Sequence, residues 1–276
     1  MPIYLATCAP LPEPDPDEAL LLDALRARGL SASMVAWNQR PPPQDGPTVL
    51  RSTWDYHHHL SEFLSWCEGC ARIYNSVALA RWSAHKSYLL DLAAAGVPTV
   101  PTVLLPPGST ARLDRISDRL GWPDMVLKPA VGAASWGAKR VTAPTGQVHL
   151  ESLLAERGAL IQPYMAEVDG EGERAVVVID GEITHCVRKS PRLSGDDESV
   201  SGALSVAPDE AAVVRAALAV AEARTQDRPL YARVDLVRDG SGAPRVMELE
   251  LLEPSLFLLQ HPPALERLAD ALAALR

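Results

Sequence analysis

The sequence YARVDLVRDGSGAPRVMELEL occupies residues 231–251 and predicts two strands joined by a turn. Its middle is rich in Asp, Gly and Ser, with an apolar run on either side. Side chains two positions apart on a strand project from the same face, so Arg233 and Asp235 point the same way. Glu248 and Glu250 share a face of the second strand for the same reason. Pairing of the strands therefore brings the three carboxylates together.

Three carboxylates at one place need a positive partner, because neighbouring like charges otherwise force protonation. Mg²⁺ suits such a group, since it prefers oxygen ligands and completes its shell with water and phosphate oxygens. The alternative is three strand carboxylates that face solvent. Apolar neighbours such as Val234 and Leu236 indicate instead that the strands are largely buried. We therefore predict a Mg²⁺ site formed by Asp235, Glu248 and Glu250.

A second group of residues is cationic. Lys128 ends an apolar strand, Lys86 lies among apolar residues of a predicted helix, and Arg188 and Lys189 end another predicted strand. A lone lysine is usually a solvated surface residue, but four cations near a group of carboxylates fit a triphosphate and metal site better. Residues 132–137, GAASWG, add small residues whose backbone amides can approach phosphate oxygens, although they match neither a P-loop nor a GxGxxG motif.

The first part of the chain predicts a parallel sheet, because strands alternate with helices. Its expected strands are residues 3–8, 30–37, 48–51 and 72–75, and its expected helices are residues 17–28, 60–71 and 83–95. Residues 97–102, VPTVPT, are extended because each proline restricts the residue before it. We place the first domain boundary there.

The rest of the chain predicts two smaller α+β units. The expected strands that precede the quoted stretch are residues 125–128, 139–142, 159–162, 174–179 and 182–189, and the expected helices are residues 111–120, 147–156, 209–224 and 262–275. Residues 194–205 are polar and predict a mobile loop. The predicted domains are thus residues 1–97, on the substrate side, residues 98–165, and residues 166–276, which carry the carboxylates.

Composition excludes several classes of protein. Of the 276 residues, 47% are hydrophobic and 22% are charged, which is typical of a folded globular chain. The formal net charge of −9 argues against a uniformly basic face for nucleic acid or anionic lipid, but allows a local basic pocket for phosphate. Neither a membrane-spanning run nor a secretory signal is recognised. We therefore expect a cytoplasmic protein with a small-molecule substrate; a homo-oligomer is compatible with the composition.

Two further motifs have a structural and a functional interpretation. Cys67 and Cys70 have the CxxC spacing of redox pairs and zinc sites, but they fall near the end of a predicted helix rather than at its start. We interpret them as small residues of an amphipathic helix, and redox or zinc chemistry as the alternative. The run of residues 57–59, HHH, is expected to be a solvated loop.

The order of these motifs resembles the ATP-grasp superfamily, which includes D-alanine–D-alanine ligase, glutathione synthetase and the ribosomal-protein glutamate ligases. The resemblance covers nearly the whole chain. Its motifs are Lys86, Lys128-Pro129, the loop at 132–137, Gln162-Pro163-Tyr164-Met165, Gly172-Glu173, Arg233-Val234-Asp235 and Glu248-Leu249-Glu250. The longer runs RSTWDY at 51–56 and ELLEPSLF at 250–257 are similar to the D-cycloserine synthetase-like branch. The implied fold is an α/β (α+β ATP-grasp) architecture that holds ATP between its last two units.

The resemblance implies a role for each matching residue. Those that would bind ATP are Lys86 and Lys128 at the phosphates, the closing loop at Ser135, Trp136 and Gly137, the adenine hinge at Gln162, Pro163, Tyr164 and Met165, and Glu173 at the ribose. Asp235, Glu248 and Glu250 would hold Mg²⁺, although many members have Asn in place of Glu250. Arg233 would stabilise the acyl phosphate and the tetrahedral intermediate, assisted by Arg188 or Lys189.

The acceptor side departs from the glutamate ligases, which carry a Gly-Asp-Phe-Arg-like run where this chain has GDDE at 195–198. Arg192 could substitute for the missing arginine, or the substrate differs. Arg51 ends a predicted parallel strand, where ligands commonly bind, and is a candidate substrate contact with Asp55, Glu253 and Ser255. A surface ion pair between Arg51 and Asp55 is the alternative.

The implied activity is that of an ATP-dependent carboxylate ligase that forms an acyl phosphate and releases ADP and phosphate. Ring closure of an O-ureido-serine-like amino-acid derivative is its specific form, and ligation of two molecules is the alternative. A nucleotide-binding protein without catalysis is a third hypothesis, against which the intact set of cations and carboxylates argues.

Overall fold

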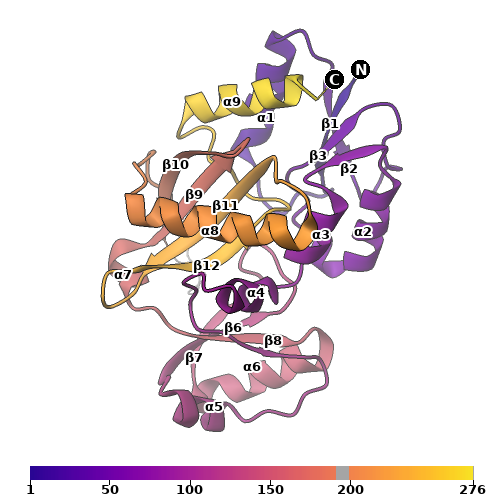
Figure 1. Cartoon of the computed structure of the whole chain (residues 1–276). Helices are drawn as coiled ribbons and strands as arrows, with labels where there is room; N and C mark the ends of the chain where they lie inside the picture. Colours follow the sequence, from indigo (N-terminus) through magenta and orange to yellow (C-terminus); the bar gives the residue numbers. More distant parts are fainter. Residues whose placement is uncertain (191–198, 276) are drawn as a thin grey trace.

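The computed structural model describes residues 1–190 and 199–275, within which the strands form three four-stranded sheets (Figure 1). The first sheet has the order β2-β1-β3-β4 and is parallel throughout, as predicted. Its strands are β1 (Ile3–Thr7), β2 (Ala32–Ala36), β3 (Pro47–Leu50) and β4 (Arg72–Tyr74). The helices α1 (Pro16–Ala27) and α2 (Leu60–Gly69) and the 3₁₀ turn η1 (Tyr56–His58) connect them.

The second sheet, in the lower part of Figure 1, has the order β5-β8-β6-β7 with antiparallel pairs. Its strands are β5 (Val103–Leu105), β6 (Asp124–Pro129), β7 (Lys139–Thr142) and β8 (Ala159–Pro163). The helices α5 (Leu113–Leu120) and α6 (Ala143–Glu156) pack on one face of it through Leu113, Leu150 and Leu154. The opposite face of this sheet borders the cavity described below.

The third sheet, β10-β9-β11-β12, is antiparallel and has a hydrophobic layer on each face. Its strands are β9 (Glu173–Ile179), β10 (Glu182–Lys189), β11 (Tyr231–Arg238) and β12 (Pro244–Glu250). Alternate residues of β9 face opposite sides: Val176 packs against α8 (Pro208–Thr225), and Val177 lies in the cluster formed with α1 and α9 (Pro262–Ala273). A short helix, α7 (Glu167–Glu171), precedes β9.

The single helix expected at 83–95 is wrong. The chain forms α3 (Val77–Ser83) and α4 (Tyr88–Ala94), and Lys86 lies in the turn between them. The His85 ring contacts the backbone N–H and the hydroxyl of Ser87, and such local side-chain bonds compete with helical ones. The Lys86 N–H donates instead to the Ala130 carbonyl, 2.8 Å away. The turn therefore ties Lys86 to the segment after β6.

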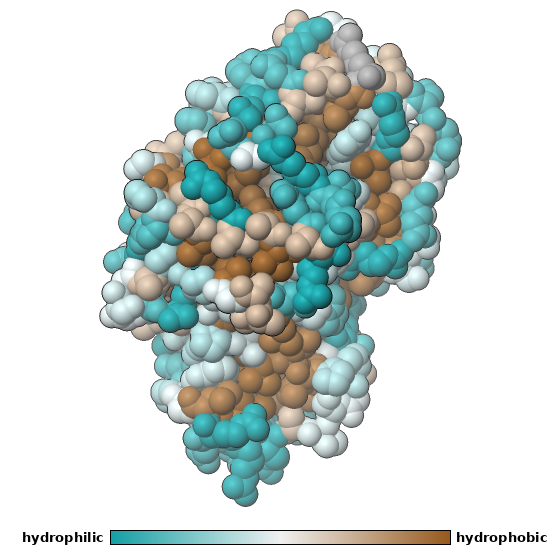
Figure 2. All heavy atoms as spheres, in the orientation of Figure 1, coloured by the Kyte–Doolittle hydropathy of each residue, from teal (hydrophilic) through white to brown (hydrophobic). Residues whose placement is uncertain are grey.

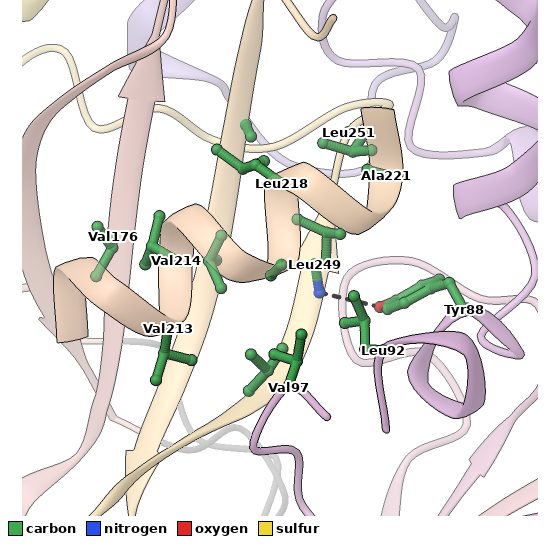
Figure 3. Packing of buried hydrophobic residues seen from close by; sticks show 14 of the residues in the cluster. Tyr88, Leu92, Val97, Val176, Val213, Val214, Leu218, Ala221, Leu249 and Leu251 are labelled. Carbon is green, nitrogen blue, oxygen red and sulfur yellow. Dashed lines mark hydrogen bonds between the residues drawn. The ribbon is translucent and has the colours of Figure 1, made fainter. Parts of the chain in front are cut away.

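Helix α4 fastens this turn to the third sheet (Figure 3). Tyr88 and Leu92 pack in the same cluster as α8 and Leu249 of β12. The Leu249 N–H donates to the Tyr88 hydroxyl at 3.1 Å. Residues 98–100 continue the attachment, since the Val246 N–H donates to the Pro98 carbonyl at 2.8 Å. The position of Lys86 relative to β12 is therefore set by buried contacts.

Each sheet lies within one of the ranges 1–97, 98–165 and 166–276, but the division into domains itself stays a prediction. In the expected loop at 194–205, residues 191–198 lie outside the described part of the chain. The following residues run beside β10, where the Leu204 N–H donates to the Cys186 carbonyl at 2.8 Å. Figure 2 shows apolar side chains interspersed with polar ones on the visible face. Among the described helices none is long and apolar enough to cross a membrane.

Replacing Leu92 with Ala tests the attachment of α4. Leu92 is fully buried, so Leu92→Ala should lower the free energy of unfolding by about 3 kcal/mol through lost transfer energy and a residual cavity. Val148→Ala, at a side chain 78% exposed on α6, should change it by less than about 0.5 kcal/mol. Urea denaturation measures both, and equal effects would contradict the packing described.

Candidate active site

A cavity is lined by strand residues of the second and third sheets and by segments that follow strands of all three sheets. Every ATP-contact candidate except Gly137 lines it: Lys86, Lys128, Ser135, Trp136, Gln162, Pro163, Tyr164, Met165 and Glu173. Among the other candidates it brings together Lys189, Arg233, Glu248, Glu250, Glu253 and Ser255. Most of the residues singled out in the sequence thus surround one space.

The hairpin β11–β12 supplies the acidic wall of this cavity. In the antiparallel register Arg233 lies opposite Glu250, and Asp235 lies opposite Glu248. Seven of the eight residues of β11 are buried, whereas Glu248 and Glu250 alternate with buried residues of β12 and reach the cavity. The strand period of two therefore places one arginine and three carboxylates on one face, as the sequence predicts.

Arg233 connects two of these carboxylates. Its Nε and Nη2 donate to the two oxygens of Asp235 at 2.8 and 3.0 Å, and Nη2 also donates to Glu250. Nη1 donates to the carbonyl of Ser255 at 3.3 Å. Burial alone would raise the pKa of Asp235, but Arg233 and Lys189 outweigh it and hold that pKa well below its usual range. Asp235 is therefore an ionised, fixed acceptor.

Lysines from other elements reach the remaining carboxylates. Lys86 donates to Glu248, and Lys189 Nζ lies 2.7 Å from Asp235 and 3.2 Å from Glu173. Burial opposes ionisation of Glu248, but Lys86 and Lys128 outweigh it and lower its pKa. Burial likewise opposes the charge on Lys86, whose pKa is nevertheless raised by Glu248. The pairs Lys86–Glu248 and Lys189–Asp235 join elements that are distant in sequence, whereas Lys189–Glu173 joins the consecutive strands β9 and β10.

Negative charge is in excess at the end of β12. Burial raises the pKa of Glu250 to about 7, and Asp235 and Glu248 add to this against the opposing charge of Arg233. Burial and the neighbouring Glu250 raise the pKa of Glu253 well above its ordinary value. A bound cation would relieve this excess.

The carboxylate group fits Mg²⁺ by its chemistry. Its donors are hard oxygens, two of them on side chains that line the cavity. In the described residues the carboxylates are turned to arginine and lysine, and no group of three acidic, His or Cys side chains is already arranged around a metal position. Holding Mg²⁺ therefore requires Glu248 and Glu250 to exchange part of their lysine and arginine contacts for the ion.

The opposite end of the cavity is apolar. Val100, Val126, Val168 and Met247 line it beside the hinge at Gln162–Met165, and Val100, Val168, Met165 and Met247 belong to one cluster. The side chain of Gln162 donates to the Thr102 hydroxyl at 3.0 Å. These residues give the cavity an apolar wall beside residues 162–165.

The loop after β6 forms another part of the cavity wall. Ser135 has a φ of 57° and Gly137 a φ of 70°, and Gly132 packs so closely on Pro129 that a Cβ would lie 2.9 Å from the proline ring. Gly137 flanks the cavity rather than lining it, and its carbonyl lies 2.8 Å from His149 Nε2. The backbone conformation and close packing of the turn itself require small residues at these positions.

Arg188, Arg51 and Asp55 lie away from the cavity. Arg188 neighbours Lys189 on a strand, so its side chain projects to the opposite face, where it lines a separate hollow with Arg174 and Glu210. Asp55 accepts hydrogen bonds from Trp37 Nε1 at 2.6 Å and from Asn38 at 2.7 Å. Arg51 does not pair with it.

Arg51 is buried beneath the segment that carries Glu253 and Ser255. Its Nη1 donates to the Pro254 carbonyl at 3.2 Å, and its Nη2 lies 3.9 Å from both Asp15 and Asp17. Asp17 accepts the backbone N–H groups of Leu256 and Leu258 at 2.9 and 2.8 Å. These buried charges fix the position of the segment that carries Glu253 and Ser255. The acidic run at 195–198 and Arg192 lie outside the described residues.

Several residues that line the cavity were not singled out from the sequence, among them Glu13 and Trp54. Both follow strands of the parallel sheet, β1 and β3, at the edge where ligands commonly bind. The same rule that drew attention to Arg51 therefore indicates them, once the loops are followed four to six residues beyond the strand ends.

The expectation for residues 57–59 is wrong at His57, which is buried although His58 and His59 are exposed. The cysteines agree with the structural interpretation. Cys67 is buried on α2 and Cys70 follows its end, both are free, and burial raises the pKa of each thiol. A raised pKa disfavours the thiolate that redox and zinc chemistry use.

The pH dependence of stability tests the buried charges around Arg51. Burial, opposed in part by Arg51, raises the pKa of Asp15 to about 6 from 3.8. The folded chain thus holds this proton more tightly than the unfolded chain. The contribution of protonated Asp15 to the free energy of unfolding is therefore lost as the pH rises from about 4 to about 6. Across that interval the free energy of unfolding of Asp15→Asn should therefore rise by up to about 3 kcal/mol relative to that of the native chain.

Chemical denaturation at pH 4 and pH 7 measures this difference. Asp118→Asn, at an exposed position on α5, controls for the loss of one negative charge. A difference between the native chain and Asp15→Asn that does not change with pH would contradict the raised pKa.

Comparison with known proteins gives consistent results. The family described as D-cycloserine synthetase DcsG, N-terminal domain, matches residues 3–76. Cycloserine biosynthesis protein DcsG of Streptomyces lavendulae is 35% identical over 285 residues, which cover 94% of this chain and 93% of that protein. The crystal structure of D-cycloserine synthetase DcsG superposes with a TM-score of 0.87 at 34% identity, over 99% of both chains. The ATP-grasp ligase PsnB, complexed with a minimal precursor, Mg and ADP, superposes with a TM-score of 0.64 at 18% identity, over 99% of this chain and 97% of PsnB.

Proposed function

This chain belongs to the D-cycloserine synthetase family of ATP-grasp carbon–nitrogen ligases, and on that premise we propose that it phosphorylates a substrate carboxylate with ATP and then closes a ring by forming an amide bond. The proposed substrate is an O-ureido-serine-like amino-acid derivative, in which carboxylate and nucleophilic nitrogen belong to one molecule. The proposed site of action is the cytoplasm, where ATP is supplied.

One observation carries this proposal: Arg233 is fixed by Asp235 and Glu250 at the centre of the cavity wall. An acyl phosphate and the tetrahedral intermediate that follows it both place negative charge on oxygen, and a preorganised donor stabilises such charge. Two hydrogen bonds to Asp235 hold this donor in place, so it keeps its orientation when Glu250 turns to a metal ion. A nucleophilic Ser or Cys is not required for this chemistry.

The remaining residues suit the binding of Mg-ATP. The apolar end at Gln162–Met165 would take adenine, Glu173 the ribose, and Lys86 and Lys128 the phosphates. Asp235, Glu248 and Glu250 would hold Mg²⁺, which when bound neutralises phosphate charge. The PsnB complex with Mg and ADP is a precedent for this pair of ligands on the same fold.

The proposed reaction has two steps. A substrate carboxylate oxygen attacks the γ-phosphorus of ATP, and the bond to the β,γ-bridging oxygen breaks with its electron pair leaving on ADP. The ureido nitrogen then attacks the acyl carbon, and the C–O bond to phosphate breaks. The departing phosphate carries that electron pair and accepts the proton of the nitrogen. Lys86, Lys128 and Arg233 supply the positive charge that both steps need.

The test is ADP release and product formation with Mg-ATP, on single amino acids, amino-acid pairs, and ureido and hydroxamate derivatives of D- and L-serine. Asp235→Ala is the control. ADP release and a cyclic product from one ureido compound, absent in the control, is the expected result. Turnover only with an amino-acid pair would contradict ring closure and support ligation of two molecules. Nucleotide binding without turnover on any compound would favour a non-catalytic protein.

The roles of two arginines can be separated by conservative substitution. Arg233→Lys keeps the charge but loses the fork that engages Asp235 and Glu250, so kcat should fall by about 10²-fold. Arg188→Lys, on the opposite face of β10, should retain activity within about twofold. Steady-state phosphate release measures both, with thermal denaturation to verify folding. A comparable loss in both variants would contradict the assignment of Arg233 to the site.

A further inference from the structure

The exposed ring of Trp136 makes contacts that the binding of ATP does not explain. Trp136 is 40% exposed and lines the cavity from the loop after β6. Its ring centroid lies 5.0 Å from that of His57, at an angle of 36°, and 5.4 Å from that of His58, at 76°. The guanidinium carbon of Arg157 lies 4.8 Å from the same ring. Three side chains from two other segments thus surround one tryptophan.

His57 contributes a ring rather than a hydrogen bond to this contact. It is buried in η1, directly after the parallel sheet, and among the described residues its Nδ1 has no hydrogen-bond partner. Burial, with the positive charges of Arg157 and Lys86 nearby, lowers its pKa to about 4, so the ring is neutral at pH 7. A neutral imidazole packs against indole in this tilted geometry without repelling the guanidinium beside it.

Arg157 completes the connection between two parts of the chain. It follows α6 of the second sheet, and its Nη1 donates to the main-chain carbonyl of His57. Its guanidinium therefore spans from the second sheet to η1, and contacts the Trp136 ring as it does so. The contact joins the first sheet's region to the second across one edge of the cavity.

The loop that carries Trp136 is shaped to hold this position. Ala134 and Ser135 both have left-handed backbone, with φ of 49° and 57°, which is uncommon for residues other than glycine. The Trp136 N–H donates to the Ala133 carbonyl at 2.9 Å, closing the turn. A conformation of this kind persists where surrounding contacts fix it. Here the contacts available at the tip are those of His57, His58 and Arg157.

We propose that His57 and Arg157 are positioning residues that hold Trp136 across the cavity, so that the loop covers the phosphate end of ATP and excludes water from the acyl phosphate. This inference rests on the proposed function for its chemical role, but not for the contact itself. Exclusion of water matters because an acyl phosphate that meets water returns the carboxylate and phosphate, and ATP is consumed without product.

Two pairs of variants test the inference. His57→Ala removes the stacking ring, whereas His57→Phe keeps a ring and discards only the nitrogens. Arg157→Met removes the guanidinium, and Arg115→Met, at an exposed position of α5 on the same sheet, is its control. Amide hydrogen exchange of residues 130–138 in the ligand-free protein should be about tenfold faster in His57→Ala and Arg157→Met, and unchanged in the other two.

The kinetic measurement is the ratio of phosphate released to product formed. We expect a ratio of one for the native chain and for His57→Phe, and a several-fold higher ratio for His57→Ala and Arg157→Met. In the latter two, KM for ATP should rise about tenfold while kcat changes less than threefold. A purely structural role would leave the ratio at one.

The outcomes are distinguishable. Unchanged hydrogen exchange in His57→Ala and Arg157→Met would overturn the positioning contact. Faster exchange with a ratio that stays at one would overturn its role in excluding water. Failure of the native chain to form product from any carboxylate would count against the proposed function, while the exchange result would still decide whether these residues position the loop.

Discussion

Charges that are buried on the hairpin β11–β12 must be compensated, and this requirement organises the rest of the molecule. Asp235 is almost fully buried, and an uncompensated carboxylate there would cost several kcal/mol. Arg233 comes from the same strand, Lys189 from β10, and Lys86 from the turn between α3 and α4. Each neighbouring element thus brings a cation to one surface, and the cavity lies where these cations meet.

The same charges explain why the cavity is suited to a charged ligand. The carboxylates of the site contact arginine and lysine, and negative charge is in excess near Glu250 and Glu253. In the proposed complex with Mg-ATP, a metal ion would replace the cations at the carboxylates, and phosphate oxygens would replace the carboxylate at Lys86. The raised pKa of Glu250 indicates where negative charge is in excess, and hence where a metal ion stabilises the site most.

The sequence predicts the parts that depend on short-range periodicity. Alternation on strands places Arg233, Asp235, Glu248 and Glu250 correctly, and the alternation of strands and helices predicts the parallel sheet. The same rule shows that Arg188 and Lys189 face opposite ways, so only one of the two can reach the cavity.

Features that depend on contacts distant in sequence were not predictable. The turn at Lys86 exists because its N–H is taken by Ala130, 44 positions along the chain. His57 is buried because Trp136 and Arg157 cover it, and Arg51 is directed to Pro254 rather than to its neighbour Asp55. None of these partners can be identified from local composition.

The central claim is that the substrate carboxylate becomes an acyl phosphate, and oxygen transfer tests it most directly. If a substrate carboxylate labelled with ¹⁸O at both oxygens is turned over with Mg-ATP, the released phosphate should carry one ¹⁸O atom per product formed, since one carboxylate oxygen bonds to phosphorus and leaves with it. Mass spectrometry of the phosphate measures this. Product formation with unlabelled phosphate would contradict an acyl phosphate, and with it the role assigned to the charges of this hairpin.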